Sequence, residues 1–135
     1  MYKNIFIPVA LDHELNINEM ISVAQRLMSD GGKITLVGVV EQVPDYVAEY
    51  ATVKSDTSVK SHMTERLQAI AAQHSDIEVA ILSGKPGVVI ADWAETSKAD
   101  LIIIGSHRPG VQDYFLGSTA SRVVRRAPCA VMVLR

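Results

Sequence analysis

Glycine, serine and basic residues gather in one stretch of the sequence, residues 105–119, and such residues are suited to holding an anion. The stretch begins Gly105-Ser106-His107-Arg108 and ends Gly117-Ser118-Thr119. The first backbone N–H groups of a helix have no partner within the helix, so a phosphate can accept their hydrogen bonds, and glycine permits its close approach. The stretch therefore predicts a phosphate-binding loop. An ordinary connection, capped by a Ser or Thr side chain, is the alternative.

Other catalytic and metal-binding patterns are incomplete. Gly84-Lys85 is not a P-loop, because Val79 stands where that motif needs glycine and Pro86 where it needs Ser or Thr. The four histidines, at positions 13, 62, 74 and 107, are never three or four residues apart. Cys129 is the only cysteine, so it has no partner for a metal knuckle or an internal disulfide. The sequence therefore predicts neither a metal site nor an efficient enzyme.

Composition sets the class of protein. With 48% hydrophobic and 21% charged residues, the chain is globular rather than disordered. Its 135 residues predict one domain, residues 1–135. A net charge of −2 gives no general attraction to nucleic acid or an anionic membrane, even with basic residues near the end of Ser118–Arg126. The N-terminus lacks the apolar region of a signal peptide, and no apolar run approaches the ~18–20 residues that span a bilayer, so we expect a cytoplasmic protein.

Strand and helix patterns alternate along the whole chain. Apolar runs predict strands at Asn4–Ala10, Ile34–Val40, Ile77–Leu82, Leu101–Ile104 and Ala130–Leu134. Helical spacing of apolar residues predicts helices from Asn18 to the Gly31-Gly32 stop, over Val59–Ala71, over Pro86–Ala94 and over Ser118–Arg126. This alternation predicts an α/β fold, a single doubly wound five-stranded parallel sheet with helices on both faces (Rossmann-like).

Ligands of such sheets bind beyond the carboxyl ends of the strands, where the strand order reverses. If the first and fourth strands flank that point, the ends of strands one, two and four lie beside the loop of residues 105–119. The predicted phosphate loop would then lie within a crevice.

Five segments from one end of the chain to the other together carry a family pattern. These are Ile-Pro-Val at 7–9, Leu-Val-Gly-Val-Val at 36–40, Gly-Lys-Pro at 84–86, the Gly-Ser-His…Gly-Ser block, and the closing Arg-Arg-Ala-Pro-Cys-Ala-Val-Met-Val-Leu-Arg. With these segments, the chain resembles the universal stress protein family. The resemblance implies the universal stress protein type of fold and binding of an adenine nucleotide, ATP first, with ADP, AMP and Mg²⁺ as further candidates. The implied nucleotide-binding residues are Pro8, Val9, Ala10, Asp12, Val39, Ile104, Gly105, Ser106, His107, Arg108, Gly117, Ser118 and Thr119.

The resemblance also implies a role for each group of these residues. Gly105–Arg108 would line the phosphate loop, and Gly117–Thr119 would contact phosphates at the start of the helix. The backbone of Val39 would bond the adenine, and Pro8 and Ile104 would border the base.

Two positions depart from the family's nucleotide-binding pattern. Arg108 replaces the second glycine of Gly-x-x-Gly, and the loop after it is one residue shorter. Ala10 stands where an Asp usually bonds the ribose, so either Asp12 takes over that contact or it is lost. A charge-assisted bond of this kind contributes about 1.5–3 kcal/mol.

Two functions remain open from the sequence. The first is an ATP-binding stress-response or signalling module, without efficient catalysis and with slow ATP hydrolysis at most. The second is an interaction module whose degenerate pocket binds no nucleotide. Both share a homodimer formed through the apolar edge strand Ala130–Leu134, and both leave the protein partner unidentified.

Overall fold

The computed structural model describes residues 1–9, 17–41, 56–106 and 117–135. Its elements, in chain order, are β1 (Tyr2–Val9), α1 (Ile17–Leu27), β2 (Met28–Val40), α3 (Asp56–Ala71), β3 (Ile77–Ser83), α4 (Pro86–Thr96), β4 (Leu101–Gly105), α5 (Ser118–Arg126) and β5 (Ala130–Leu134). Most of these lie within a residue or two of the predicted elements.

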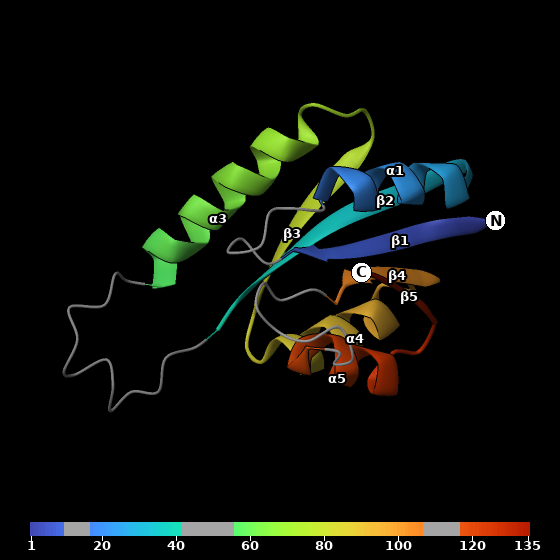
Figure 1. Ribbon diagram of the computed structural model, residues 1–135. Helices are drawn as coiled ribbons and strands as arrows, with labels where there is room; N and C mark the ends of the chain where they lie inside the picture. Colours follow the sequence, from blue (N-terminus) through green and yellow to red (C-terminus); the bar gives the residue numbers. More distant parts are fainter. Residues whose placement is uncertain (10–16, 42–55, 107–116) are drawn as a thin grey trace.

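The strands form one five-stranded parallel sheet in the order β3-β2-β1-β4-β5 (Figure 1). Helices α1 and α3 pack on one face of the sheet, and α4 and α5 pack on the other. The predicted doubly wound fold is therefore confirmed. The sheet order also places β5 at an edge, as the sequence predicted.

The two faces of β1 bury alternate side chains, as a strand covered on both sides requires. Ile5 and Ile7 pack with the α1–α3 side and are 0% exposed. Phe6 points to the α4–α5 side, where its ring centroid lies 5.0 Å from that of Trp93. Trp93 thus packs in the core, as its place on the predicted third helix indicated.

The end of the first helix differs from the prediction. α1 begins at Ile17, one residue before the expected cap, and ends at Leu27 rather than at the glycine pair. Met28 already pairs with Tyr2 of β1, and the register then jumps so that Asn4 pairs with Lys33. Pairing with β1 therefore outweighs the helical pattern here. The glycines lie inside the irregular start of β2, where Gly31 takes a φ of +77°.

A hydrogen-bonded clasp joins the amino ends of β1 and β4. The Asp100 carboxylate accepts the backbone N–H groups of Lys3 at 2.8 Å and Asn4 at 2.9 Å. The backbone N–H of Asp100 donates to the Asn4 carbonyl at 3.0 Å, and the Asn4 side-chain amide donates to the Ser97 carbonyl at 2.8 Å. These bonds fix the register of the two central strands at the end opposite the predicted site.

Candidate functional site at the carboxyl edge of the sheet

The switch point lies between β1 and β4, as predicted. These strands are neighbours, pairing Ile5 with Leu101 and Phe6 with Ile102. The helix after β1 packs on one face of the sheet and the helix after β4 on the other. The carboxyl ends of β1, β2 and β4 therefore lie along one edge, beside the start of α5 (Figure 1).

The residues expected to border a base lie on the α4–α5 side of this edge. Ile104 is 5% exposed and packs there, as does the half-buried Val39. Pro8 is buried and shares the face of Phe6, because both occupy even positions of β1. Val9 points to the opposite face and packs with α1 and α3. Three of these four residues thus line one side of the edge, and Val9 contributes only its backbone there.

Gly105 ends β4 at an exposed position with free space around it. A Cβ built on Gly105 would have no atom of the described residues within 4 Å. Packing against the described residues therefore does not require glycine here, and those residues leave the space above it open to a ligand.

Gly117 is the N-cap of α5 and also faces open space. Its backbone is extended (φ −58°, ψ 159°), and no side-chain hydrogen bond caps the helix within the described part of the chain. A Cβ at this position would likewise meet no described atom within 4 Å. Among the described residues, α5 is therefore capped by Gly117 and not by a Ser or Thr side chain. The first turn, with exposed Ser118 and half-buried Thr119, keeps backbone N–H groups that the helix cannot use.

Ser106 is held by the edge strand β5. Its backbone N–H donates to the Leu134 carbonyl at 2.9 Å, and its hydroxyl donates to the same oxygen at 3.4 Å. These bonds continue the β4–β5 ladder by one residue, because Gly105 already pairs with Leu134. The start of the predicted phosphate loop is thereby tied to the last strand. Ala10, Asp12, His107 and Arg108 lie outside the described residues.

Gly84 holds the end of β2, a role that the sequence reasoning did not assign to it. Its N–H donates to the Val40 carbonyl at 3.0 Å, and its φ of +132° is a conformation that glycine alone adopts readily. A Cβ at Gly84 would also lie 2.7 Å from Val89 Cγ1. The Gly-Lys-Pro triplet was the available signal, since glycine followed by proline often marks a turn into a helix.

The described residues form no cluster of titratable side chains at this edge. Among the described residues, no group of three or more His, Cys, Asp or Glu side chains could hold a metal ion. Burial, and then the charge of Asp100, raises the pKa of the half-buried Cys129 thiol. Cys129 precedes β5 and so lies at the amino edge with Asp100, away from the glycines. A raised pKa leaves less thiolate at neutral pH, so Cys129 is expected to be a poor nucleophile.

The fold and this edge define a small doubly wound α/β domain with Rossmann-like architecture. The model of the universal stress protein family matches residues 1–135, and the chain belongs to that family. It is 30% identical over 140 residues to a Thermus aquaticus protein, the universal stress protein in QAH/OAS sulfhydrylase 3′ region, with 100% of both chains covered. Among the residues that the structure describes, no helix is long and apolar enough to cross a membrane.

Solved structures share the fold. The universal stress protein UspA from Lactobacillus plantarum superposes with a TM-score of 0.74 at 27% identity, covering 99% of this chain and 98% of that one. An Archaeoglobus fulgidus universal stress protein, solved in complex with dAMP, gives a TM-score of 0.68 at 18% identity over 99% and 98% of the two chains. A universal stress protein in complex with cAMP gives 0.64 at 19% identity, with 99% and 97% covered.

Proposed function

We propose that this chain binds an adenine nucleotide at the carboxyl edge of its sheet, with ATP as the first candidate. It would act in the cytoplasm as a stress-response or signalling module without efficient catalysis. Pro8 and Ile104 would border the base, and the Val39 backbone would bond it. Gly105 and Gly117–Thr119 would hold the phosphates.

One observation carries the proposal: two glycines at the switch point, Gly105 and Gly117, both face open space. Neither has a positive φ, and neither is packed against a described neighbour, so the fold itself does not require glycine at either position. Close approach of a ligand to the backbone gives a reason for both. The uncapped start of α5 supplies N–H donors and partial positive charge for a phosphate beside them.

The dAMP and cAMP complexes of other universal stress proteins support an adenine ligand. Neither ligand is a triphosphate, so the choice of ATP, ADP or AMP, and any Mg²⁺, depends on binding experiments with this chain. Loss of the Asp-to-ribose contact at Ala10 lowers the expected affinity about tenfold to a hundredfold unless Asp12 replaces it. Hydrolysis would be slow, because the sequence offers no evident activating base or Walker-type Mg²⁺ carboxylate, and the described residues hold no cluster of three or more possible metal ligands.

Equilibrium dialysis with ATP, ADP and AMP tests the proposal, together with the variant Gly117→Val. Valine would fill the open space at the N-cap while its backbone conformation stays allowed, so we expect the fold to remain and binding to be lost. Ala72→Val, on an exposed residue just after α3, adds similar bulk away from the edge and should bind as the parent does. No association at millimolar nucleotide would refute the function, and normal binding by Gly117→Val would refute the cradle.

We further propose that the chain forms a homodimer through β5. The Leu134 carbonyl points to β4, and the pleat alternates, so the backbone groups of Val131 and Val133 point to the open edge. On α5, the 45% exposed Val124 lies on the flank away from Arg122, which faces α4. The open backbone groups can pair with β5 of a second copy, and the exposed Val124 offers an apolar contact beside that strand.

Val131→Pro tests the dimer, because it removes an outward N–H donor without breaking a bond to β4. Val131→Ala is the control, since it removes the same side chain and keeps the donor. Light scattering should show a dimer for the parent and Val131→Ala, and a monomer for Val131→Pro. A monomeric parent at micromolar concentration would refute the interface. A dimer that binds no nucleotide would favour the alternative function, an interaction module with an empty pocket.

A further inference from the structure

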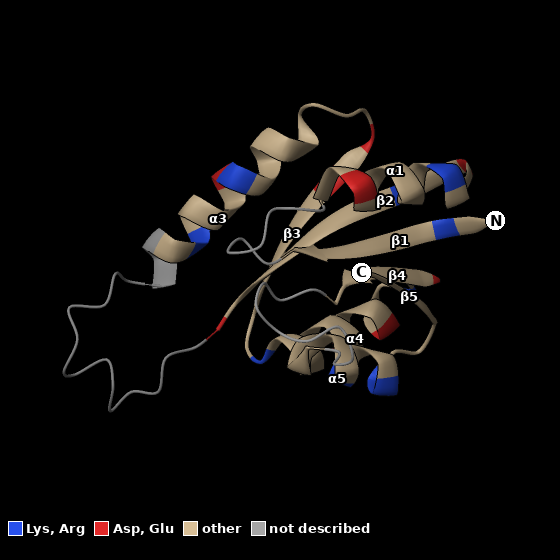
Figure 2. Ribbon diagram, in the orientation of Figure 1, with Lys and Arg blue, Asp and Glu red and all other residues tan. Residues whose placement is uncertain are grey.

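Helix α5 concentrates positive charge. Its nine residues include Arg122, Arg125 and Arg126 and no Asp or Glu (Figure 2). All three arginines are exposed. Within the described part of the chain, none of their guanidinium groups lies within 4.0 Å of a carboxylate. We call these three residues the arginine face.

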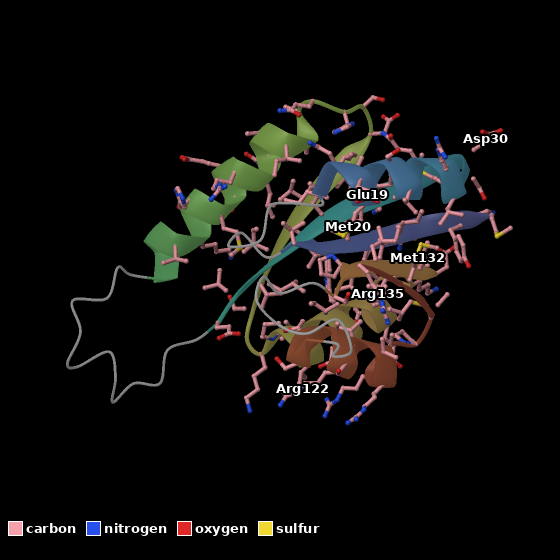
Figure 3. The ribbon with its side chains drawn as sticks, viewed as in Figure 1. Glu19, Met20, Asp30, Arg122, Met132 and Arg135 are labelled. Atoms are coloured by element: carbon pink, nitrogen blue, oxygen red, sulfur yellow. The ribbon has the colours of Figure 1, made fainter. Side chains whose placement is uncertain are left out.

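The arginine face points to solvent, and the opposite side of α5 packs against the sheet. Ala120 and Val123 bury the side of α5 that faces the sheet, and helical geometry places the arginines on the side opposite them. Arg122 lies beneath the α4–α5 layer, away from the sheet (Figure 3). The two helices approach so closely that a Cβ on Gly87 of α4 would lie 2.5 Å from the Cβ of Arg122. The stem of Arg122 is therefore fixed, and its charged end remains available.

Local charge balance does not explain the face. Cations in the last turn of a helix offset its dipole, which accounts for Arg125 and Arg126. Arg122 lies in the middle of the helix, beyond the reach of that effect. The exposed carboxylates of Asp92 and Glu95 on the adjoining α4 form no ion pair with it.

We propose that the arginine face docks an acidic segment of a partner protein. Guanidinium groups pair with carboxylates in a two-pronged geometry, and three of them on one rigid helix face recognise a segment with several Asp or Glu residues. Nucleic acid fits less well. The chain as a whole is negative, at −2, α5 is only about 14 Å long, and none of its side chains is aromatic to stack on a base. The docking surface is independent of the proposed nucleotide site.

Fluorescence anisotropy with a labelled twelve-residue peptide of alternating Glu and Ala tests the proposal on the full chain. We expect saturable binding at 50 mM salt that weakens at least threefold at 150 mM, because exposed pairs are screened. Arg122→Glu combined with Arg125→Glu should weaken binding at least tenfold. Arg122→Glu keeps a stem to lie along Gly87, so α5 should remain folded, and circular dichroism checks this.

The matched control is Arg26→Glu combined with Lys60→Glu. Both are exposed helical cations on α1 and α3, and this pair of reversals changes the net charge by the same amount. It should leave the peptide affinity within twofold of the parent. Equal losses in the two double variants would mean that net charge alone drives binding, and would overturn the proposal. So would the absence of peptide binding at 50 mM salt, or tighter binding of a twelve-nucleotide single-stranded DNA.

Discussion

The substitution Gly84→Ala should destabilise the fold strongly, because two separate costs meet at this residue. Its φ of +132° is one that L-residues rarely adopt, and such strain costs on the order of 1–3 kcal/mol. A Cβ would also lie 2.7 Å from Val89 Cγ1, and overpacking of this kind adds about 1 kcal/mol or more. Together they predict a loss of about 2–4 kcal/mol in the free energy of unfolding.

Substitutions at two other glycines distinguish the cost of backbone strain from the cost of the close contact. Gly31 has a φ of +77° and no described atom within 4 Å of a built Cβ, so Gly31→Ala carries only the backbone cost, about 1–2 kcal/mol. Gly105 has neither a positive φ nor a close neighbour, so Gly105→Ala should change stability by less than about 0.5 kcal/mol. Comparing the three variants assigns the loss at Gly84 to strain, to contact, or to both.

Urea unfolding followed by tryptophan fluorescence is the assay. Trp93 is the only tryptophan and packs against Phe6 in the core, so its emission reports the folded state. Adding Val89→Ala to Gly84→Ala removes Cγ1 and should recover the contact cost but not the strain. Stability of Gly84→Ala within 0.5 kcal/mol of Gly105→Ala, at equal m-values, would refute the reasoning.

Two further predictions concern packing and titration. Gly87→Ala should lower the free energy of unfolding by about 1–3 kcal/mol, because its Cβ would meet Arg122 Cβ, which moves only with the backbone of α5. Gly38→Ala should lower it less in the same urea assay, because its Cβ would meet only the ends of side chains, those of Met63, Leu67 and Ile81. Because burial and the charge of Asp100 raise the pKa of Cys129, the folded state holds the thiol proton more tightly than the unfolded state does. Its contribution to stability is full below the unfolded pKa and is lost as the pH rises through the folded pKa. Labelling by an aromatic disulfide at pH 8 should therefore be slower in the native protein than in urea, and equal rates would contradict this.

The sequence predicts the sheet because its three inner strands, β2, β1 and β4, are buried on both faces over most of their length and so contain nearly continuous apolar runs. Leu101–Ile104 shows this plainly, since all four residues are buried on β4. The sequence fails at the end of α1, where Met28 fits a helical pattern but pairs with Tyr2. That pairing depends on a strand 26 positions away in the chain, and local periodicity carries no trace of it.

The residues of the candidate site can be predicted from the sequence, but their surroundings cannot. Gly117 and Gly105 stand out in the sequence because they lie at the two ends of a strand-to-helix loop, where glycine permits close approach of a phosphate. Their open surroundings, however, depend on neighbours from other elements and appear only in the fold. Ser106 is the clearest case: its hydroxyl suits a phosphate in the sequence, yet its partner in the structure is the Leu134 carbonyl of β5.

The two edges of the sheet use their polar groups differently, and this difference favours a ligand at one of them. At the amino edge, Asp100 accepts two backbone N–H groups of β1, so donors there are consumed within the protein. At the carboxyl edge, α5 begins on a glycine that no described side chain caps, and a second glycine, Gly105, ends β4 at the same edge. A Ser or Asp N-cap would stabilise α5 by about a few tenths of a kcal/mol relative to glycine, because its side chain would accept one of the first N–H groups. Its absence leaves those donors to a ligand, which is the physical argument for a phosphate at Gly117.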